Sequence, residues 1–424
     1  MPTLINREKY VQETLAFANT DLVKVVTGIR RCGKSSLLQL VQDRLESMAH
    51  PQDAFLSLNL EQLELGIDTG EKLHDYCMSR ASKKGRTYIF IDEVQNIEGW
   101  HSAINSLRVS LDCDLYVTGS NAFLMSSDIA TYLSGRYVEI RMLPLAFNEY
   151  IDFCKVKPTE NKDFFEQADG SPILSSSLFE RYMAYGGMPG IANLELTQQM
   201  HHSYMASLYE SVVQRDVLQR GSSQALQPVS NEALLRSLCA FLSDNIGNMT
   251  SPNKLAETLT SFGTSVTNKT VQSYINALIG AFVVYPCKRF DLHGKKILKT
   301  NGKYYLVDTG LRTYLDDYRN SDSGRVLENL VHLHLLYRGF SVHVGKLYSK
   351  EVDFVAKNDG KIVYIQVADN LYSPETMERE LAPLRAIGDN HEKLIVVRQG
   401  SYPAEIDGIK IVAAVDFCLS SNIQ

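Results

Sequence analysis

The chain has 424 residues, 44% of them hydrophobic and 22% charged, with a formal net charge of −6 and a sequence pI near 6.0. This length exceeds one ordinary hydrophobic core and predicts roughly two or three domains of soluble, globular composition. The acidic balance disfavours a protein that depends on non-specific nucleic-acid binding, while leaving a local basic face open.

The sequence indicates neither a membrane segment nor a signal peptide. No uninterrupted apolar stretch approaches the ~20 residues of a membrane span, and the first ten residues contain Arg7, Glu8 and Lys9 instead of an apolar block. The cysteines are odd in number, scattered, and without a Cys-x-x-Cys pair: Cys32, Cys77, Cys113, Cys154, Cys239, Cys287 and Cys418. This pattern disfavours a zinc site or a disulfide framework, so we expect a cytoplasmic protein with no membrane partner.

The first third of the sequence alternates short apolar runs with segments of helical periodicity. A helix is predicted at residues 34–48. Strands are predicted at residues 22–27, 54–58, 87–91, 114–118 and 138–141. Strands separated by helical segments imply a parallel sheet covered on both faces, so we expect an α/β domain over residues 1–145.

The rest of the chain is predicted to form three further segments. Residues 146–230 favour helices, including a long amphipathic one at 200–219, with a turn over the Gly-Gly-Met-Pro-Gly run at 186–190. Residues 231–315 show the order of a winged helix: helices at 232–243, 253–259 and 267–279, then strands at 283–290 and 303–307. Residues 316–424 return to α/β, with helices at 325–338 and 374–387 and strands at 351–357, 361–367 and 393–397.

The strongest motif lies between the first predicted strand and the first predicted helix. It matches the P-loop pattern GxxxxGK[ST], followed by Ser36: Gly28, Ile29, Arg30, Arg31, Cys32, Gly33, Lys34 and Ser35. In such a loop, backbone N–H groups and the helix N-terminus surround the phosphates. Lys34 would reach the β- and γ-phosphates, and the Ser35 hydroxyl would bind Mg²⁺. The motif therefore predicts ATP and Mg²⁺ as cofactors, bound by residues 28–36.

A second motif is the apolar strand 87–91 that ends in Asp92 and Glu93. Asp92 would hold Mg²⁺ through water, and Glu93 would act as the catalytic base that polarises the attacking water. Alone this pattern is weak, because many buried strands end in acids. Its position downstream of the P-loop makes a catalytic pair the favoured interpretation.

Five further residues are candidates for the chemistry. Ser120 and Asn121 follow the next predicted strand and would orient water near the γ-phosphate, or would only cap a helix. Arg136 would serve as an arginine finger for a neighbouring subunit, or would be a surface or ion-paired residue. Arg30 and Arg31 would contact phosphate or an acidic neighbour.

Taken together, the runs TGIRRCGKSSLL, FIDEVQNIEGW, VTGSNAFL and LSGRYVEIRMLPLAFNEY resemble a prokaryotic AAA-type P-loop ATPase family whose members carry a C-terminal domain of unknown function. The resemblance implies a P-loop NTPase parallel sheet in which Asp92 and Glu93 form the Walker B pair. It also implies that Asn121 or its neighbours act as sensor and Arg136 as finger.

The last segment resembles the restriction-endonuclease-like domain of the same family. That nuclease site needs an acid on the first helix, an aspartate on one strand and Glu-x-Lys on the next. Glu328 and Asp353 fit the first two positions, but Gln366 and Ala368 stand where the acid and the lysine belong. We therefore expect an impaired or dead nuclease that keeps the fold.

The winged-helix interpretation adds a DNA hypothesis. Polar residues suit a recognition helix: Thr267, Asn268, Lys269, Thr270, Gln272 and Ser273. Basic residues would line the wing: Lys288, Arg289, Lys295, Lys296 and Lys299. The alternative is that these surfaces pack against a partner protein or the ATPase domain.

The favoured function is Mg²⁺-dependent ATP hydrolysis that repositions C-terminal domains bound to nucleic acid or a protein partner, with a homo-oligomer if the finger acts in trans. Two alternatives stay open. One is a DNA-binding regulator that uses ATP as a switch with little turnover, and the other is an ATP-dependent nuclease. A metabolic kinase fits less well, because no substrate lid with a basic cluster is evident.

Overall fold

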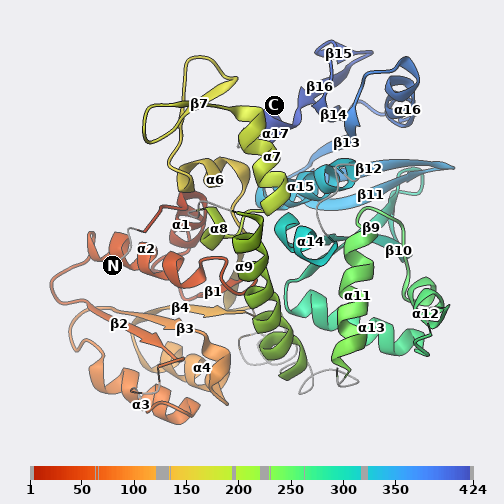
Figure 1. Cartoon of the computed structure of the whole chain (residues 1–424). Coiled ribbons are helices and arrows are strands. Elements are labelled where there is room, and N and C mark those ends of the chain that lie inside the picture. The colour runs from red at the N-terminus through yellow and green to blue at the C-terminus, as the bar shows by residue number, and fades with distance from the viewer. Residues whose placement is uncertain are drawn as a thin grey trace. The chain divides into compact units, whose positions relative to one another are not determined.

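The computed structural model describes residues 4–62, 64, 66–120, 133, 135–192, 197–219, 229, 231–261, 263–316 and 323–420. The chain forms two compact units. Unit 1 comprises Met1–Met142 with Gly280–Phe282, and unit 2 comprises Leu143–Ile279 with Val283–Gln424. Figure 1 shows the elements of both units in chain order, coloured from red to blue.

Unit 1 is built on a five-stranded sheet with the order β2-β3-β4-β1-β5, in which every neighbouring pair is parallel. The strands are β1 (Val23–Thr27), β2 (Ala54–Asn59), β3 (Thr87–Asp92), β4 (Cys113–Gly119) and β5 (Tyr137–Arg141). All five lie where the sequence predicts them. Every residue of β1 and β3 is buried, which agrees with a parallel sheet covered on both faces.

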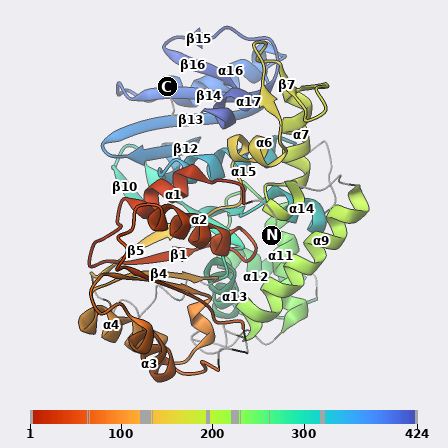
Figure 2. The same cartoon turned by 90° about the vertical axis from the view of Figure 1, so that its left-hand side faces the viewer.

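Helices cover this sheet from two sides. They are α1 (Glu8–Leu15), α2 (Lys34–Glu46), α3 (Gly70–Arg80) and α4 (Trp100–Ser110). Figures 1 and 2 place α1 and α2 on one face and α3 and α4 on the other. On the latter face, Leu73 and Leu107 join a core with Ile89 and Val117 of the central strands. Because β4 lies between β1 and β3, the carboxyl ends of all three strands meet at one edge.

Unit 2 contains an eight-stranded sheet with the order β10-β9-β11-β12-β13-β14-β16-β15. Its strands are β9 (Val284–Asp291), β10 (Lys296–Leu306), β11 (Ser341–Leu347), β12 (Lys350–Asn358), β13 (Lys361–Asn370), β14 (Glu392–Gln399), β15 (Glu405–Ile406) and β16 (Ile409–Ala413). Phe354 of β12 contacts the His332 ring of α15 (Ser323–Tyr337), whereas Val355 packs in a core with Leu384 of α16 (Pro374–Arg385). Successive strand residues face opposite ways, so these helices cover opposite faces of the sheet.

The hairpin of β9 and β10 pairs differently from expectation. The sequence analysis assigns these strands to a wing inside a segment that ends at residue 315. In the structure β9 lies antiparallel to β10 and parallel to β11, so the hairpin extends the C-terminal sheet across that boundary. Alternation of apolar residues identifies a strand, but it does not say which distant strand will be its partner.

Three helices precede the hairpin in the expected order: α11 (Glu232–Asp244), α12 (Pro252–Ser261) and α13 (Asn268–Gly280). An isolated bridge joins Thr250, between α11 and α12, to Gly302 of β10. The three helices and the hairpin therefore follow the element order predicted for residues 231–315, whereas the bridge at Thr250 was not predicted.

The predicted helical segment also contains a small sheet that the sequence analysis missed: β6 (Lys157–Pro158), β7 (Phe164–Glu166) and β8 (Pro172–Leu174). Around it lie α6 (Phe147–Phe153), α7 (Ser175–Tyr185), α8 (Pro189–Ala192) and α9 (Gln198–Ser211). The long helix predicted at 200–219 is α9 continued by a π-helix, Val212–Gln219. Unit 2 also contains the helices α14 (Thr309–Asp316) and α17 (Ala414–Leu419).

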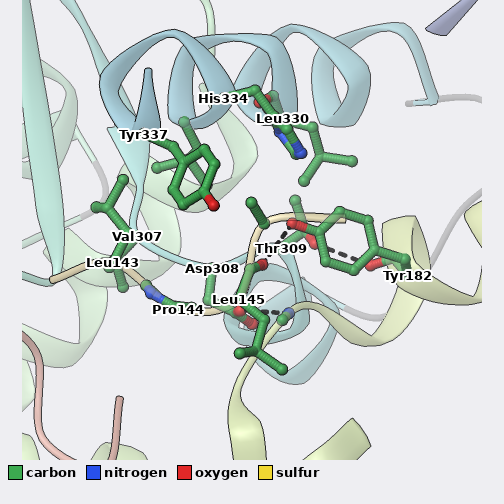
Figure 3. Close-up of a pocket in the computed structure, with 13 residues that line it drawn as sticks. Leu143, Pro144, Leu145, Tyr182, Val307, Asp308, Thr309, Leu330, His334 and Tyr337 are labelled. Atoms are coloured by element: carbon green, nitrogen blue, oxygen red, sulfur yellow. Dashed lines mark hydrogen bonds between the residues drawn. The ribbon is translucent and has the colours of Figure 1, made fainter. Parts of the chain in front are cut away.

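Asp308 explains the predicted glycine turn at 186–190 (Figure 3). Its buried carboxylate accepts N–H bonds from Gly187 at 2.7 Å and from Gly310 at 2.9 Å. A Cβ at Gly186, where φ is +80°, would come within 1.9 Å of Asp308 Oδ1, so only glycine fits there. The adjoining cavity measures about 10 Å³, which is room for one water at most.

Candidate nucleotide site

The glycine loop joins β1 to α2 and requires both of its glycines. A Cβ at Gly28 would meet Met142 O at 2.2 Å, so the backbone passes too close for any side chain. Gly33 is the residue before α2 and adopts φ 106°, a left-handed conformation that glycine tolerates best. Between them, Cys32 N donates to Ile29 O at 3.3 Å and tightens the turn. The loop is therefore fixed in shape by its own backbone.

Two arginines hold this loop, Arg7 from outside it and Arg30 from within it. Arg7, which is 3% exposed, donates to the carbonyl oxygen of Cys32 at 3.0 Å. Arg30 pairs with Glu61 at 3.4 Å, which is the acidic neighbour that the sequence analysis offers as one of its two options. Arg31 is exposed and adopts φ 65°. The sequence analysis did not identify Arg7, because nothing in its local pattern points to a contact 25 residues away.

Lys34 is the first residue of α2, and its ammonium group turns back into the loop. Nζ donates to Gly28 O at 3.0 Å and to Ile29 O at 3.3 Å, and it lies 3.9 Å from Glu93 Oε1. The side chain is only 4% exposed, so these carbonyls satisfy a buried cation. Ser35 and Ser36 follow on the first turn of α2 and are exposed.

Asp92 ends β3, and neighbouring strands hold its carboxylate on both sides. Thr118 of β4 donates its hydroxyl to Asp92 Oδ1, and Asn59 of β2 donates to Oδ2 at 3.4 Å. Thr118 Oγ1 also accepts the backbone N–H of Glu93 at 2.9 Å. Asp92 is 7% exposed. The parallel register of the three strands thus fixes where this carboxylate points.

Glu93 leaves the strand in a left-handed conformation, with φ 57°. Gln95 donates its side-chain amide to Glu93 Oε2, and the same nitrogen lies 3.4 Å from Ser120 Oγ at the end of β4. Among the described residues, Gln95 Oε1 is buried without a hydrogen-bond partner. Gln95 was not predicted as a site residue, although its position two residues after Glu93 was an available signal.

The structure therefore gathers most of the predicted site at one sheet edge. Lys34, Asp92 and Glu93 lie together, with Ser120 reached through Gln95. Asn121 lies outside the described residues. Arg136 is exposed and precedes β5; its carbonyl accepts Val23 N at 2.9 Å. It therefore lies beside the start of β1, at the opposite end of that strand from the P-loop.

The oxygen donors present fit Mg²⁺. Magnesium is bound by one or two protein oxygen groups together with substrate phosphates, rather than by a cage of protein ligands. The exposed Ser35 hydroxyl and the oriented Asp92 carboxylate supply such donors. No group of three or more His, Cys, Asp or Glu side chains suited to a metal occurs in the part of the chain that the structure describes.

Comparisons with known proteins identify the family of this chain. Residues 20–151 match a family model described as an AAA domain, and residues 176–322 match a domain of unknown function (DUF8612). An uncharacterized protein of Haemophilus influenzae is 36% identical over 418 residues, covering 98% of this chain and 99% of that protein. The chain belongs to the same family as this protein. Its N-terminal part is a P-loop ATPase domain of the AAA type.

More distant proteins share less with this AAA protein. An uncharacterized protein of Methanocaldococcus jannaschii is 27% identical over 363 residues, covering 85% of this chain and 77% of that protein. The structure of a Walker-type ATPase from Pyrococcus abyssi has a TM-score of 0.49 at 15% identity, covering 73% of this chain and 95% of that chain. Among the described residues, no helix has the length and apolar character needed to cross a membrane.

Proposed function

We propose that the AAA domain binds ATP with Mg²⁺ and hydrolyses it. The observation that carries this proposal is the distance of 3.9 Å between Lys34 Nζ and Glu93 Oε1. A cation suited to phosphate and a carboxylate suited to accept a proton from water share one small site. Phosphoryl transfer to water depends on this combination, because its catalysis consists of positioning and charge stabilisation.

Each residue of the site has a defined role in this proposal. Backbone N–H groups of the loop would hold the phosphates, and Lys34 would exchange its two carbonyl partners for phosphate oxygens. Mg²⁺, held by Ser35 and Asp92, supplies positive charge against the phosphates. Glu93 would accept the proton of the attacking water, and Gln95 would keep that carboxylate in position.

The test is Glu93→Gln, which keeps the shape of the side chain and removes its basicity. ATP binding should stay within about twofold of wild type, while kcat should fall by about 10²- to 10⁴-fold. Binding is measured with a fluorescent ATP analogue and turnover by phosphate release. Glu98→Gln, on the same loop and exposed, is the matched control and should change neither. Wild-type turnover in Glu93→Gln would remove the proposed base.

We further propose that nucleotide state repositions unit 2, and that Arg136 acts on the site of a second copy of the chain. Its place beside the start of β1, away from its own P-loop, suits action in trans rather than in cis. Static light scattering with and without a non-hydrolysable ATP analogue tests this. A particle that stays monomeric with the analogue, together with undiminished turnover in Arg136→Ala, would contradict the proposal.

A second candidate function is DNA binding by unit 2. We infer a winged helix from the order α11, α12, α13, β9, β10, and its proposed contact residues Asn268, Lys269 and Gln272 are exposed. The hairpin adds exposed Lys295 and Lys296. In a duplex-binding assay, mutating both lysines to alanine should weaken binding. The slope of log K against log salt concentration should also become shallower, by the amount expected for the loss of about two phosphate contacts. Equal binding by wild type and variant would reject a wing contact.

We also propose that the C-terminal part has a restriction-endonuclease-like arrangement without nuclease activity. Glu328 and Asp353 lie in one cleft, whereas Gln366 and Ala368 offer neither a carboxylate nor an ammonium group. A neutral amide is a poorer ligand for a hard cation than a carboxylate, because it brings no negative charge. Cutting of DNA with Mg²⁺ or Mn²⁺ that Asp353→Ala abolishes would contradict this proposal.

A further inference from the structure

A cluster of carboxylates lies in an open cleft of unit 2 with a volume of about 650 Å³. Glu328 comes from α15, while Glu351 and Asp353 come from β12. The cleft is the place where the nuclease-like arrangement would hold a divalent metal. The question is therefore what balances three negative charges there.

Lys303 of β10 supplies that balance. Its side chain is 3% exposed, and Nζ lies 2.8 Å from Glu328 Oε1, 2.8 Å from Glu351 Oε1 and 3.5 Å from Asp353 Oδ1. Burial alone would lower the pKa of Lys303, but the carboxylates outweigh burial and raise it above its ordinary value. The group is therefore a permanent cation at the centre of the cluster.

Two of the three carboxylates make further contacts beside this ammonium group. Tyr305 donates its hydroxyl to Glu328 Oε1 at 2.6 Å, and Val367 N donates to Asp353 Oδ2 at 3.0 Å. On the other side of Glu328, the Oε2 atom packs so closely on Gly247 that a Cβ there would approach to 2.7 Å. These contacts occupy part of the oxygen surface of Glu328 and Asp353, whereas the Glu351 side chain is 43% exposed.

Gln366 completes the same network. Its Oε1 accepts the backbone N–H of Asp353 at 2.8 Å, and its Nε2 donates to Glu380 Oε2 at 3.1 Å. A carboxylate at this position could not donate to Glu380, and it would add a further negative charge to the cluster. The amide therefore suits a site whose charge is already balanced by one ammonium group.

We propose that Lys303 occupies, as a built-in cation, the position that a divalent metal would take among Glu328, Glu351 and Asp353. A hard dication at the centre of these three carboxylates would lie about 2.0 to 2.6 Å from their oxygens. The same oxygens already lie 2.8 to 3.5 Å from Nζ, so both cations would compete for one small space. Two cations so close repel strongly in a partly buried site. The cluster thus binds no divalent metal, and it ties β10 to α15 and β12.

The same ammonium group has a rival role, in which it steadies a water beside a bound metal. Its direct ion pairs oppose that role, because Glu328 Oε1 and Glu351 Oε1 already contact Nζ at 2.8 Å. A lysine that serves a metal-bound water must leave the ligand oxygens to the metal. The two roles make opposite predictions for metal binding by the wild-type protein.

The test compares the full chain with Lys303→Met, which keeps the bulk of the side chain and removes its charge. In the absence of nucleotide, Mn²⁺ binding is measured by calorimetric titration. Thermal unfolding is followed in EDTA and in about 1 mM Mn²⁺, which is near the dissociation constants of weak extracellular Ca²⁺ sites. Wild type should show no saturable binding at the cluster. Lys303→Met should unfold earlier in EDTA, regain stability with Mn²⁺, and bind it at least about tenfold more tightly than wild type.

Three controls keep the outcome decisive. Lys296→Met changes an exposed lysine of the same strand and should not respond to Mn²⁺. Carrying every variant in a Lys34→Ala background excludes the nucleotide site. The double variant Lys303→Met/Glu328→Gln has one carboxylate fewer than Lys303→Met. It should fold without metal and should not respond to Mn²⁺. It therefore tests the role of the cluster even if the single variant does not fold.

Three results overturn the proposal. The first is Mn²⁺ binding by wild type that equals or exceeds binding by Lys303→Met. The second is the absence of any Mn²⁺ effect on the stability or refolding of Lys303→Met. Metal-dependent DNA cutting by wild type that is lost in Lys303→Met would favour the rival role and equally reject the built-in cation.

Discussion

Lys34 in unit 1 and Lys303 in unit 2 are both almost completely buried, with 4% and 3% of their side chains exposed, yet their partners differ in kind. Lys34 donates to two neutral carbonyls and lies 3.9 Å from its nearest carboxylate. Lys303 contacts three carboxylates directly. Neutral partners leave the charge of Lys34 available to an anionic ligand, whereas the charge of Lys303 is already balanced within the fold.

The largest expected difference comes from truncating each lysine. Lys303→Ala leaves three carboxylates without a cation in a cleft, so it should lower the free energy of unfolding by about 3 to 5 kcal/mol. Lys34→Ala should change stability by less than about 1 kcal/mol but abolish tight ATP binding. Denaturant unfolding and nucleotide titration of both variants measure this. Equal loss of stability in Lys303→Ala and Lys34→Ala would contradict the distinction between the two lysines.

Asp308 extends the comparison to a buried carboxylate that accepts hydrogen bonds from backbone N–H groups. Burial raises the pKa of Asp308 to about 6. Because the pKa of Asp308 is higher in the folded than in the unfolded state, the protonated form favours folding. This contribution to the free energy of unfolding is fully present below about pH 4 and is lost as the pH rises through about 6. Across that window wild type should lose about 2 to 3 kcal/mol relative to Asp308→Asn. Parallel stability curves for the two proteins would contradict the assignment.

The smallest expected effect tests Gln95, whose amide positions the Glu93 side chain next to Lys34. Gln95→Ala should lower kcat by about tenfold, which corresponds to one hydrogen bond to a charged group, and should leave ATP affinity unchanged. Single-turnover and steady-state phosphate release separate these quantities. Gln62→Ala, an exposed glutamine in the same unit, is the matched control. A change in affinity without a change in kcat would assign Gln95 to nucleotide binding instead.

The P-loop and the Asp92-Glu93 pair could be predicted because each motif is local and carries its own chemistry. The five parallel strands of unit 1 could be predicted for the same reason, since alternating strands and helices leave few topologies. Thr118 could not, because its hydroxyl reaches Asp92 only through the register of β3 and β4. Arg7 was missed for a similar reason: its contact spans 25 residues.

Long-range pairing limited the prediction further in unit 2. Lys303 lies 25 residues from Glu328 in sequence, and nothing near it suggests a burial site for an ammonium group. Asp308 meets Gly187 across 121 residues, so the turn was predicted without its partner. The hairpin of β9 and β10 was predicted as two strands, but its union with β11 depends on hydrogen bonds that no local pattern encodes.

That union has a practical consequence for anyone who divides the chain. The strand β9 follows the helices α11–α13 in sequence and pairs with both β10 and β11. Neither the segment 231–315 nor the segment 316–424 is therefore a self-sufficient module. A fragment ending at residue 315 would leave β9 with an unpaired, partly apolar margin where β11 should lie, which invites aggregation. Expression of unit 2 is best attempted with the hairpin and the C-terminal strands together.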